Sequence, residues 1–262
     1  MMKFNFPGPG ISCSLHNHTT FSDGASTPEE MCHAAKAAGL KIFGISDHWC
    51  VPVCDGTDWA EWCMKHEDLE KYINTLLALK SKYDDDDFCL KIGLEVEFYP
   101  ENIDSVLENL KKYPIDYLIG SVHFTGTFSV DHDIADWDGL TQAEMDDICE
   151  KYWCQLEKAA ACRDFSFIGH LDLPKKYNLI DNSKYFSHAE KVLDILQKNS
   201  GAIELNTAGW FKNCAEQYPA DAILKSALKR QIPVVINADA HHHSHINRNF
   251  KQAASLLDKL NN

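Results

Sequence analysis

The stretch Ser14-Leu15-His16-Asn17-His18-Thr19-Thr20-Phe21-Ser22-Asp23 places two histidines two positions apart and a carboxylate five residues further on. In an extended strand, residues i and i+2 point to the same side. We therefore expect His16 and His18 to converge on one metal ion, with Asp23 close by on the following loop. An H-x-H pair alone is equally compatible with two polar residues on a wet strand face. The prediction depends on whether similar residues follow other strands.

The length and composition of the chain indicate an ordinary globular protein. Its 262 residues are enough for one large domain with a sizeable core, and no internal repeat or linker divides them. No apolar run approaches the roughly 18 residues that a membrane span needs. Residues 1–10 contain one lysine and no apolar segment, so we expect no secretory signal and a cytoplasmic location.

The formal net charge of −14 repels nucleic acid polymers, and the sequence has no basic stripe that would overcome it. A small anionic substrate held by metals and a few basic residues is compatible with this charge. The ten cysteines include no C-x-x-C pair, so reduced thiols are favoured over a thiolate metal site. The sequence does not specify an oligomeric state.

Short apolar runs alternate with segments of helical periodicity, which predicts β/α units around a parallel sheet. The first helix has a capping box, with Thr27 as N-cap, Pro28 at the first position and Glu30 at the third, and Gly39 ends it. The expected strands are 11–16, 41–46, 89–95, 116–122, 165–168, 202–205 and 233–236, and the expected helices are 27–39, 67–83, 102–112, 141–162, 187–199, 220–229 and 250–260.

Two segments fall outside this pattern. The aromatic and cysteine-containing stretch 49–64 is longer than most connections, so we expect either a lid over a site or an irregular insertion. The four consecutive aspartates 84–87 cannot all face one ion, and we expect a solvated loop there rather than a calcium site.

Six of the seven expected strands end at residue types that bind metals, and closed parallel barrels carry their chemistry at these strand ends. Histidine nitrogens and carboxylate oxygens without thiolates suit zinc, manganese or iron. The set is too large for one ion, so we expect two or three, with Glu95 placed to bridge them; such clusters activate water and hold phosphoryl oxygens. The strand ends are His16 and His18, His48, Glu95, His123, His170, Asn206, and Asp239 with His241.

Several short motifs together resemble those of the polymerase-and-histidinol-phosphatase (PHP) superfamily, and are most similar to its histidinol-phosphate phosphatases. The resemblance covers residues 12–257, and the finer matches are 116–124, 170–177 and 204–209. The motifs are His16-Asn17-His18 with Asp23, Ser46-Asp47-His48, Gly93-Leu94-Glu95-Val96-Glu97, Gly120-Ser121-Val122-His123, Gly169-His170-Leu171-Asp172 and Asn237-Ala238-Asp239-Ala240-His241.

The resemblance implies an α/β fold, a distorted (β/α)7 TIM-like barrel, and three divalent metal ions. It further implies a phosphomonoesterase of histidine biosynthesis that converts L-histidinol phosphate to histidinol and phosphate. A hydroxide bridging the first two ions would attack phosphorus, with Glu95, His123 and Asp239 as catalytic residues. By motif, the first ion takes His16, His18, Glu95 and Asp239, the second Glu95, His123 and His170, and the third Asp23, His48 and His241.

The residues around the ligands carry further expectations. We expect Lys175 or Lys176 to reach the substrate phosphate, with Arg248 as a second candidate. Hydrogen bonding to imidazole or loop capping is expected for Asp47, Asp172 and Asn206. We expect His242, His243 and His245 to be exposed to solvent.

The chain departs from the family pattern at Trp210-Phe211-Lys212, where the family often has Leu-Arg-Lys, so the sequence leaves the substrate open. The alternatives are another small phosphate ester, a nucleotide or phosphodiester, and a non-catalytic metal-holding docking domain. The complete ligand set favours a catalyst. Metal identity and the general acid cannot be read from the sequence.

Overall fold

The computed structural model describes residues 12–51, 53 and 61–261. Its main sheet has eight strands in the described residues, and seven of them are neighbours in the order in which they occur along the chain, all paired in parallel. These strands are β1 (Cys13–Ser14), β2 (Ile42–Ile45), β4 (Cys89–Glu97), β5 (Tyr117–Ser121), β8 (Phe167–Ile168), β9 (Ile203–Asn206) and β10 (Val234–Asn237).

The first and last strands meet just beyond their carboxyl ends, where Asn17 and Ala240 form a parallel bridge. The amide of His18 donates to the carbonyl of Ala240 at 2.9 Å, and the amide of Ala240 donates to the carbonyl of His16 at 3.3 Å. The sheet is therefore a nearly closed barrel, and the expected (β/α)7 architecture is confirmed.

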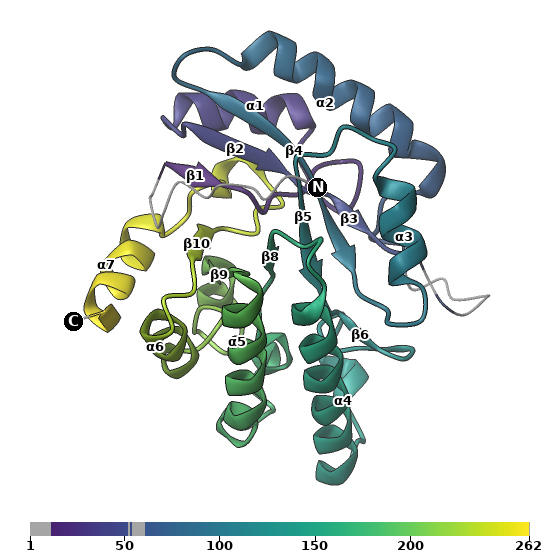
Figure 1. Ribbon diagram of the computed structural model, residues 1–262, viewed down its shortest axis with the longest axis vertical. Helices are drawn as coiled ribbons and strands as arrows, with labels where there is room; N and C mark the ends of the chain where they lie inside the picture. The colour runs from purple at the N-terminus through teal and green to yellow at the C-terminus, as the bar shows by residue number, and fades with distance from the viewer. Residues whose placement is uncertain (1–11, 52, 54–60, 262) are drawn as a thin grey trace.

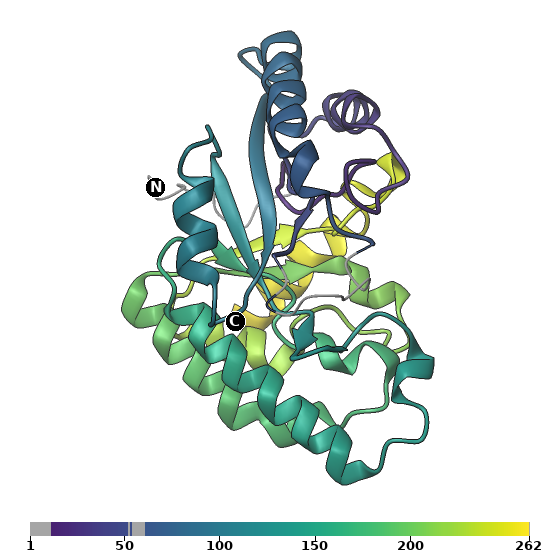
Figure 2. The same cartoon turned by 90° about the vertical axis from the view of Figure 1, so that its right-hand side faces the viewer.

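The described residues form seven α-helices, and Figure 1 shows them arranged around the strands. Figure 2 shows α4 and α5 running side by side along one flank of the barrel. Each of the seven barrel strands and seven α-helices lies within two residues of its expected bounds. No described helix is long and apolar enough to span a bilayer. The helices are α1 (Pro28–Ala37), α2 (Leu69–Tyr83), α3 (Ile103–Leu110), α4 (Gln142–Ala161), α5 (Phe186–Asn199), α6 (Asp221–Lys229) and α7 (Phe250–Asn261).

The predicted caps of α1 explain why this helix begins and ends where the sequence indicates. Thr27 accepts from the amide of Glu30, and the Glu30 carboxylate accepts from the amide of Thr27 at 2.8 Å. Gly39 follows the helix with φ of 75°, a left-handed conformation that favours glycine. The aspartates of 84–87 lie exposed in the turn after α2, as expected.

Some short elements were not predicted. Strand β3 (His48–Trp49) pairs with β4 beyond the end of β2, and β6 (Phe124–Thr125) forms a hairpin with β7 (Phe128–Ser129) after β5. Residues 52 and 54–60 of the expected 49–64 loop lie outside the described residues. The 3-10 helices are η2 (His66–Asp68), η3 (Ile134–Trp137), η4 (Leu173–Tyr177), η5 (Asn182–Tyr185), η6 (Thr207–Phe211) and η7 (His243–His245).

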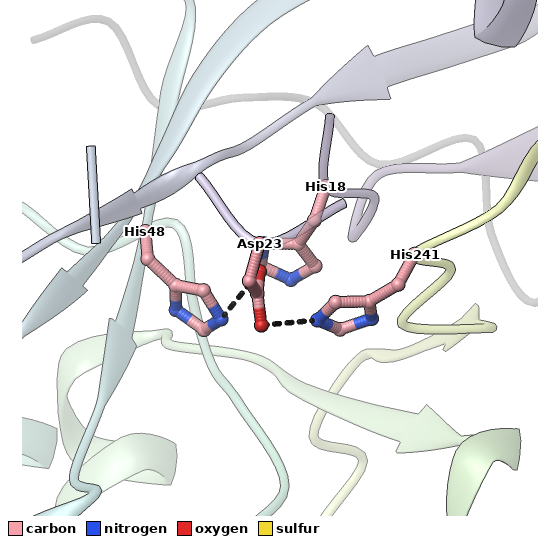
Figure 3. A group of neighbouring side chains, drawn as sticks. All are labelled: His18, Asp23, His48 and His241. Carbon is pink, nitrogen blue, oxygen red and sulfur yellow. Dashed lines mark ion pairs between the residues drawn. The ribbon is translucent and has the colours of Figure 1, made fainter. Parts of the chain in front are cut away.

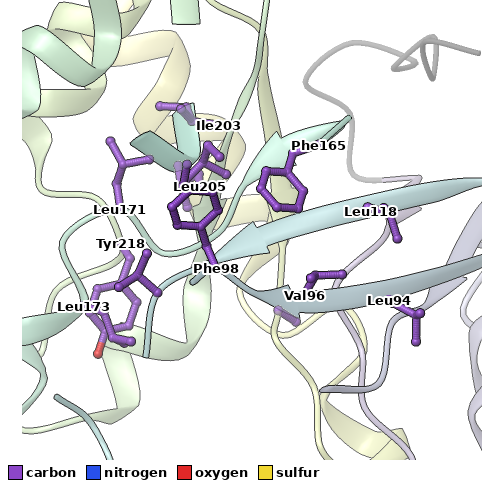
Figure 4. Packing of buried hydrophobic residues seen from close by; sticks show 14 of the residues in the cluster. Leu94, Val96, Phe98, Leu118, Phe165, Leu171, Leu173, Ile203, Leu205 and Tyr218 are labelled. Carbon is purple, nitrogen blue, oxygen red and sulfur yellow. The ribbon is translucent and has the colours of Figure 1, made fainter. Parts of the chain in front are cut away.

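Two apolar layers hold the barrel together. The outer layer lies between strands and helices; Figure 4 shows part of it, with the rings of Phe98 and Phe165 packed edge to face at 6.2 Å. The inner layer fills the barrel around Tyr117, whose hydroxyl donates to the carbonyl of Leu15. A Cβ atom on either Gly44 or Gly93 would lie 2.2 Å from a Tyr117 side-chain atom, so both positions require glycine. Tyr117 therefore plugs the interior below the carboxyl ends of the strands.

Candidate metal centre

The alternation of strand side chains brings the predicted ligands to the mouth of the barrel. Glu95 pairs with Ile119 on β5, and its side chain enters the interior directly above the apolar plug. Five imidazoles surround its two oxygens. Oε2 lies 3.1 Å from His16 Nε2, 3.5 Å from His18 Nε2 and 2.8 Å from His48 Nδ1, and Oε1 lies 2.9 Å from His170 Nε2 and 3.5 Å from His123 Nε2.

Asp239 completes the inner part of the cluster from the loop after β10. Its Oδ1 lies 3.2 Å from His18 Nε2 and 3.7 Å from His16 Nε2. Its φ of 50° is left-handed, a strained conformation that asparagine and aspartate tolerate better than most residues. The structure thus brings together the four residues expected for the first ion.

Asp23 organises the outer part of the cluster (Figure 3). Its Oδ2 lies 3.2 Å from His241 Nε2, and its Oδ1 lies 3.7 Å from His48 Nε2. The ring of His18 stacks between those of His48 and His241, at centroid distances of 4.1 and 4.3 Å.

His18 and His48 lie between groups that the motif assignment keeps apart. His18 belongs to both the inner and the outer groups, and His48 approaches Glu95 as well as Asp23. Within each group one ligand atom per residue lies within 4.8 Å of the others. The groups are His18, Asp23, His48 and His241; His16, His18 and Glu95; His16, His170 and Asp239; and His48, Glu95 and His123.

Buried ligand atoms without partners show that this cluster suits a cation. His16 Nε2, His18 Nε2 and Glu95 Oε2 have no hydrogen-bond partner among the described residues, although all three are buried and converge. Burying polar atoms unpaired is costly. Bound divalent ions would satisfy these atoms, and the nitrogen and oxygen donors suit zinc, manganese or iron.

The electrostatics of the carboxylates favour the same conclusion. Burial alone would raise the pKa of Glu95, but the charges of His16 and His123 hold that pKa well below its ordinary value. Burial also opposes ionisation of Asp239, whose pKa is nevertheless held well below the ordinary value by His16 and other nearby histidines. Both side chains are therefore anionic at neutral pH.

Two of the histidines are held in the neutral form that binds metals. Burial lowers the pKa of His18, and the neighbouring His241 lowers it further. Burial likewise lowers the pKa of His48, with His18 adding to the effect. At neutral pH their lone pairs are available to a cation.

The sequence and its fold agree with those of known proteins. The PHP domain family matches residues 14–208. This chain belongs to the PHP domain family. It is 34% identical over 251 residues to a probable histidinol-phosphatase of Deinococcus radiodurans, covering 94% of this chain and 92% of that protein.

Two solved structures show the same fold, each with a TM-score of 0.80. One is a putative histidinol phosphatase of Listeria monocytogenes, 24% identical, covering 92% of this chain and 99% of that one. The other is a histidinol phosphate phosphatase of Lactococcus lactis complexed with zinc, L-histidinol and phosphate, 20% identical, covering 95% of this chain and 94% of that one.

Two glutamates orient imidazoles of this PHP cluster, and the sequence analysis gave neither of them a role. Glu204 is fully buried and accepts from His16 Nδ1 at 3.0 Å and from the amide of His170 at 2.8 Å. The side-chain amides of Asn206 and Asn237 also donate to Glu204, at 3.0 and 2.9 Å. Because Nδ1 of His16 donates, Nε2 is the ring atom that a cation would bind once the ring is neutral.

Glu97 does the same for His123. It accepts from His123 Nδ1 at 2.7 Å, from the His123 amide at 3.0 Å and from the Phe124 amide at 3.1 Å. Glu97 lies two residues after Glu95 on β4, and Glu204 lies two residues before Asn206 on β9, so the side chains of each pair share the interior face of their strand. This spacing is the sequence signal that could have identified them.

The expected hydrogen bonds from Asp47, Asp172 and Asn206 to imidazole were wrong for the described residues. Asp47 accepts from the amide and hydroxyl of Thr19 at 2.7 and 2.8 Å, and so shapes the loop that carries Asp23. Asp172 pairs with Lys175, and Asn206 caps η6. Loop capping, the alternative expectation, holds for all three, because Asp172 also accepts from the amide of Ala220, just before α6, at 2.9 Å.

A cavity of about 310 Å³ opens over the ligand cluster, and we call it the main cavity. Lys176 lines it and pairs with Asp131 at 3.1 Å. Lys175 does not line it, because this side chain is buried between Asp172 at 3.0 Å and Glu216 at 2.6 Å.

The other basic candidates lie differently. The guanidinium of Arg248 lies 3.6 Å from the centroid of the Phe211 ring and outside the wall of the main cavity. Lys212, which was not predicted as a site residue, lines the cavity. His242, His243 and His245 are partly exposed, and none belongs to a candidate metal group of the described chain.

Proposed function

We propose that this PHP protein is a metal-dependent phosphomonoesterase that hydrolyses L-histidinol phosphate to L-histidinol and phosphate. The observation that carries the proposal is the Glu95-centred cluster of imidazoles and carboxylates at the mouth of the barrel. The relative in Deinococcus radiodurans, and the Lactococcus lactis protein complexed with zinc, L-histidinol and phosphate, support the choice of substrate.

We infer that the cluster holds three divalent ions, of zinc, manganese or iron. When bound, such ions neutralise phosphoryl oxygens and lower the pKa of water. Glu95, with oxygens facing both inner groups, is the residue suited to link two ions. The proposed ligands are His16, His18, Asp23, His48, Glu95, His123, His170, Asp239 and His241.

Glu95, His123 and Asp239 are the residues to which we assign the catalytic role. The Ser121 hydroxyl donates to Glu95 Oε1 at 2.6 Å, which fixes the carboxylate, and Glu97 fixes the ring of His123. Reacting groups gain most from ligands held rigidly before the substrate arrives.

The remaining wall of the main cavity supplies charge for the phosphate. Among the described residues of this wall the lysines are Lys176 and Lys212, and we infer that they bind the phosphoryl oxygens that the ions leave exposed. We propose one domain over residues 1–262. The nine described cysteines are unpaired thiols, which supports a cytoplasmic location.

Phosphate release from L-histidinol phosphate tests the proposal. The purified protein, supplied with manganese or zinc, should release phosphate from this ester and should leave the diester bis(p-nitrophenyl) phosphate nearly untouched. The Glu95→Ala variant should be inactive while its circular dichroism spectrum stays that of the wild type. Faster turnover of the diester would indicate a phosphodiesterase, and no turnover of either ester would indicate a non-catalytic PHP domain.

A further inference from the structure

A second cavity of about 360 Å³ adjoins the main cavity, and we call it the side cavity. The two share Trp62, Ser129 and His132, so the space over the ligand cluster continues into the side cavity. The remaining residues of its lining are Glu61, Phe124, Thr127, Phe128 and Asp136.

Trp62 stands at the border between the two cavities. Its ring packs edge to face on His48 at 4.3 Å, and it stacks with Phe124 at 5.8 Å. Phe128, on the other part of the wall, packs edge to face on Trp137 at 5.1 Å. The side cavity therefore has firmly packed aromatic walls and begins next to a proposed metal ligand.

The two cavities differ in charge. The main cavity contains the ligand cluster, which we propose to hold divalent ions, together with Lys212 and the Lys176–Asp131 pair. With these ions bound, it would suit an anionic phosphoryl group. Among the described residues, the lining of the side cavity includes the carboxylates of Glu61 and Asp136 and no lysine or arginine; Asp136 also contacts His132 Nδ1 at 2.9 Å. Aromatic faces beside carboxylates attract organic cations and flat rings. The joined space thus complements a molecule that is anionic at one end and cationic at the other.

We propose that the side cavity binds the alcohol portion of the phosphate ester and selects alcohols that carry a protonated nitrogen and a flat ring. This inference rests on the proposed phosphomonoesterase function and adds the residues that determine its selectivity. Trp62 and Phe128 supply the aromatic surface, while Glu61 and Asp136 supply the negative charge. A neutral ester would gain only the aromatic contact.

A charge-neutralising double variant, Glu61→Gln with Asp136→Asn, isolates the electrostatic part. Asp136 also accepts from the amide of Asp133 at 3.2 Å, capping η3, and asparagine retains an oxygen for that hydrogen bond. The matched control is Asp138→Asn, because Asp138 is exposed on the same loop and lines neither cavity.

The first measurement is the ratio of kcat/KM for L-histidinol phosphate to kcat/KM for p-nitrophenyl phosphate, whose alcohol portion is uncharged. We expect this ratio to fall about tenfold in the double variant, equal to ~1.4 kcal/mol of selectivity, and to be unchanged in the control. A ratio within twofold of the wild-type value in the double variant would overturn the inference.

The second measurement needs no turnover, so it separates this inference from the proposed function. Calorimetric titration with L-histidinol alone should show binding to the wild type and to the control, with Kd about tenfold higher in the double variant. Equal affinities, or no binding to the wild type, would refute the side-cavity assignment. Binding with the expected loss of affinity but no hydrolysis of either ester would reject the proposed function and leave the cavity assignment standing.

Discussion

Glu204→Gln removes one negative charge from beneath the ligand cluster and preserves the shape of the side chain. Oε1 of Glu204 accepts from His16, His170 and Asn206, while Oε2 accepts from His16 and Asn237. If the glutamine keeps its oxygen at the Oε1 site, its amide nitrogen faces two other donors. The variant therefore loses at least one hydrogen bond to a charged acceptor, which costs about 1.5–3 kcal/mol of unfolding free energy.

The same substitution leaves the His16 ring less firmly oriented, because Glu204 accepts from its Nδ1. Loss of an outer carboxylate partner of a metal-binding histidine weakens metal binding by about 10–100-fold. We expect the metal concentration that gives half-maximal phosphate release from L-histidinol phosphate to rise by that factor. Urea unfolding of the chelator-treated protein measures the stability loss separately.

Glu157→Gln is the matched control, because Glu157 accepts from His188 Nδ1 at 2.9 Å on the partly exposed outside of the barrel. Exposed ion pairs contribute about 0–1 kcal/mol, so this variant should stay near the wild type in both assays. If Glu204→Gln showed the wild-type metal dependence within twofold, the proposed orientation of His16 by Glu204 would be wrong.

Four further outcomes are expected. Glu97→Gln should lower kcat/KM for L-histidinol phosphate about 10–100-fold because the ring of His123 loses its anchor; unchanged kinetics would contradict this. Lys176→Met should raise KM in steady-state assays with little change in Tm. Lys175→Met should cost about 3–5 kcal/mol in urea unfolding because its partner Asp172 stays buried without a counter-charge. Chelation should lower Tm by several degrees in calorimetry, since ions at about 100 times their Kd stabilise by ~2.7 kcal/mol; an unmoved Tm would argue against metal binding.

The parts of the fold that could be predicted depend on local patterns. The Thr27 to Glu30 capping box is a four-residue signal, and the structure has it as expected. The ligand cluster could be predicted for a similar reason, because parallel strands carry whatever follows each of them to one rim. This rule requires no knowledge of which residues touch.

The parts that could not be predicted depend on the three-dimensional path of the chain, which decides both the contacts between distant residues and the directions in which neighbouring side chains point. Glu204 acts on His16, 188 residues away in the chain, and no local pattern encodes that pair. Lys175 and Lys176 are neighbours in η4, yet one is buried between carboxylates and the other lines the main cavity. Only the path of the backbone distinguishes them. Strand β3 has two residues and is too short for a periodic signal.

The seam between β1 and β10 joins residues from the two ends of the chain, as the Leu15 amide bonded to Asn237 across 222 positions illustrates. The Asn17–Ala240 bridge lies between His16 and His18 on one side and Asp239 and His241 on the other. A truncated polypeptide that lacks β10 and the loop after it therefore has neither a closed barrel nor the proposed metal ligands Asp239 and His241. Closure of the barrel and assembly of the proposed metal centre therefore depend on the same contacts between β1 and β10.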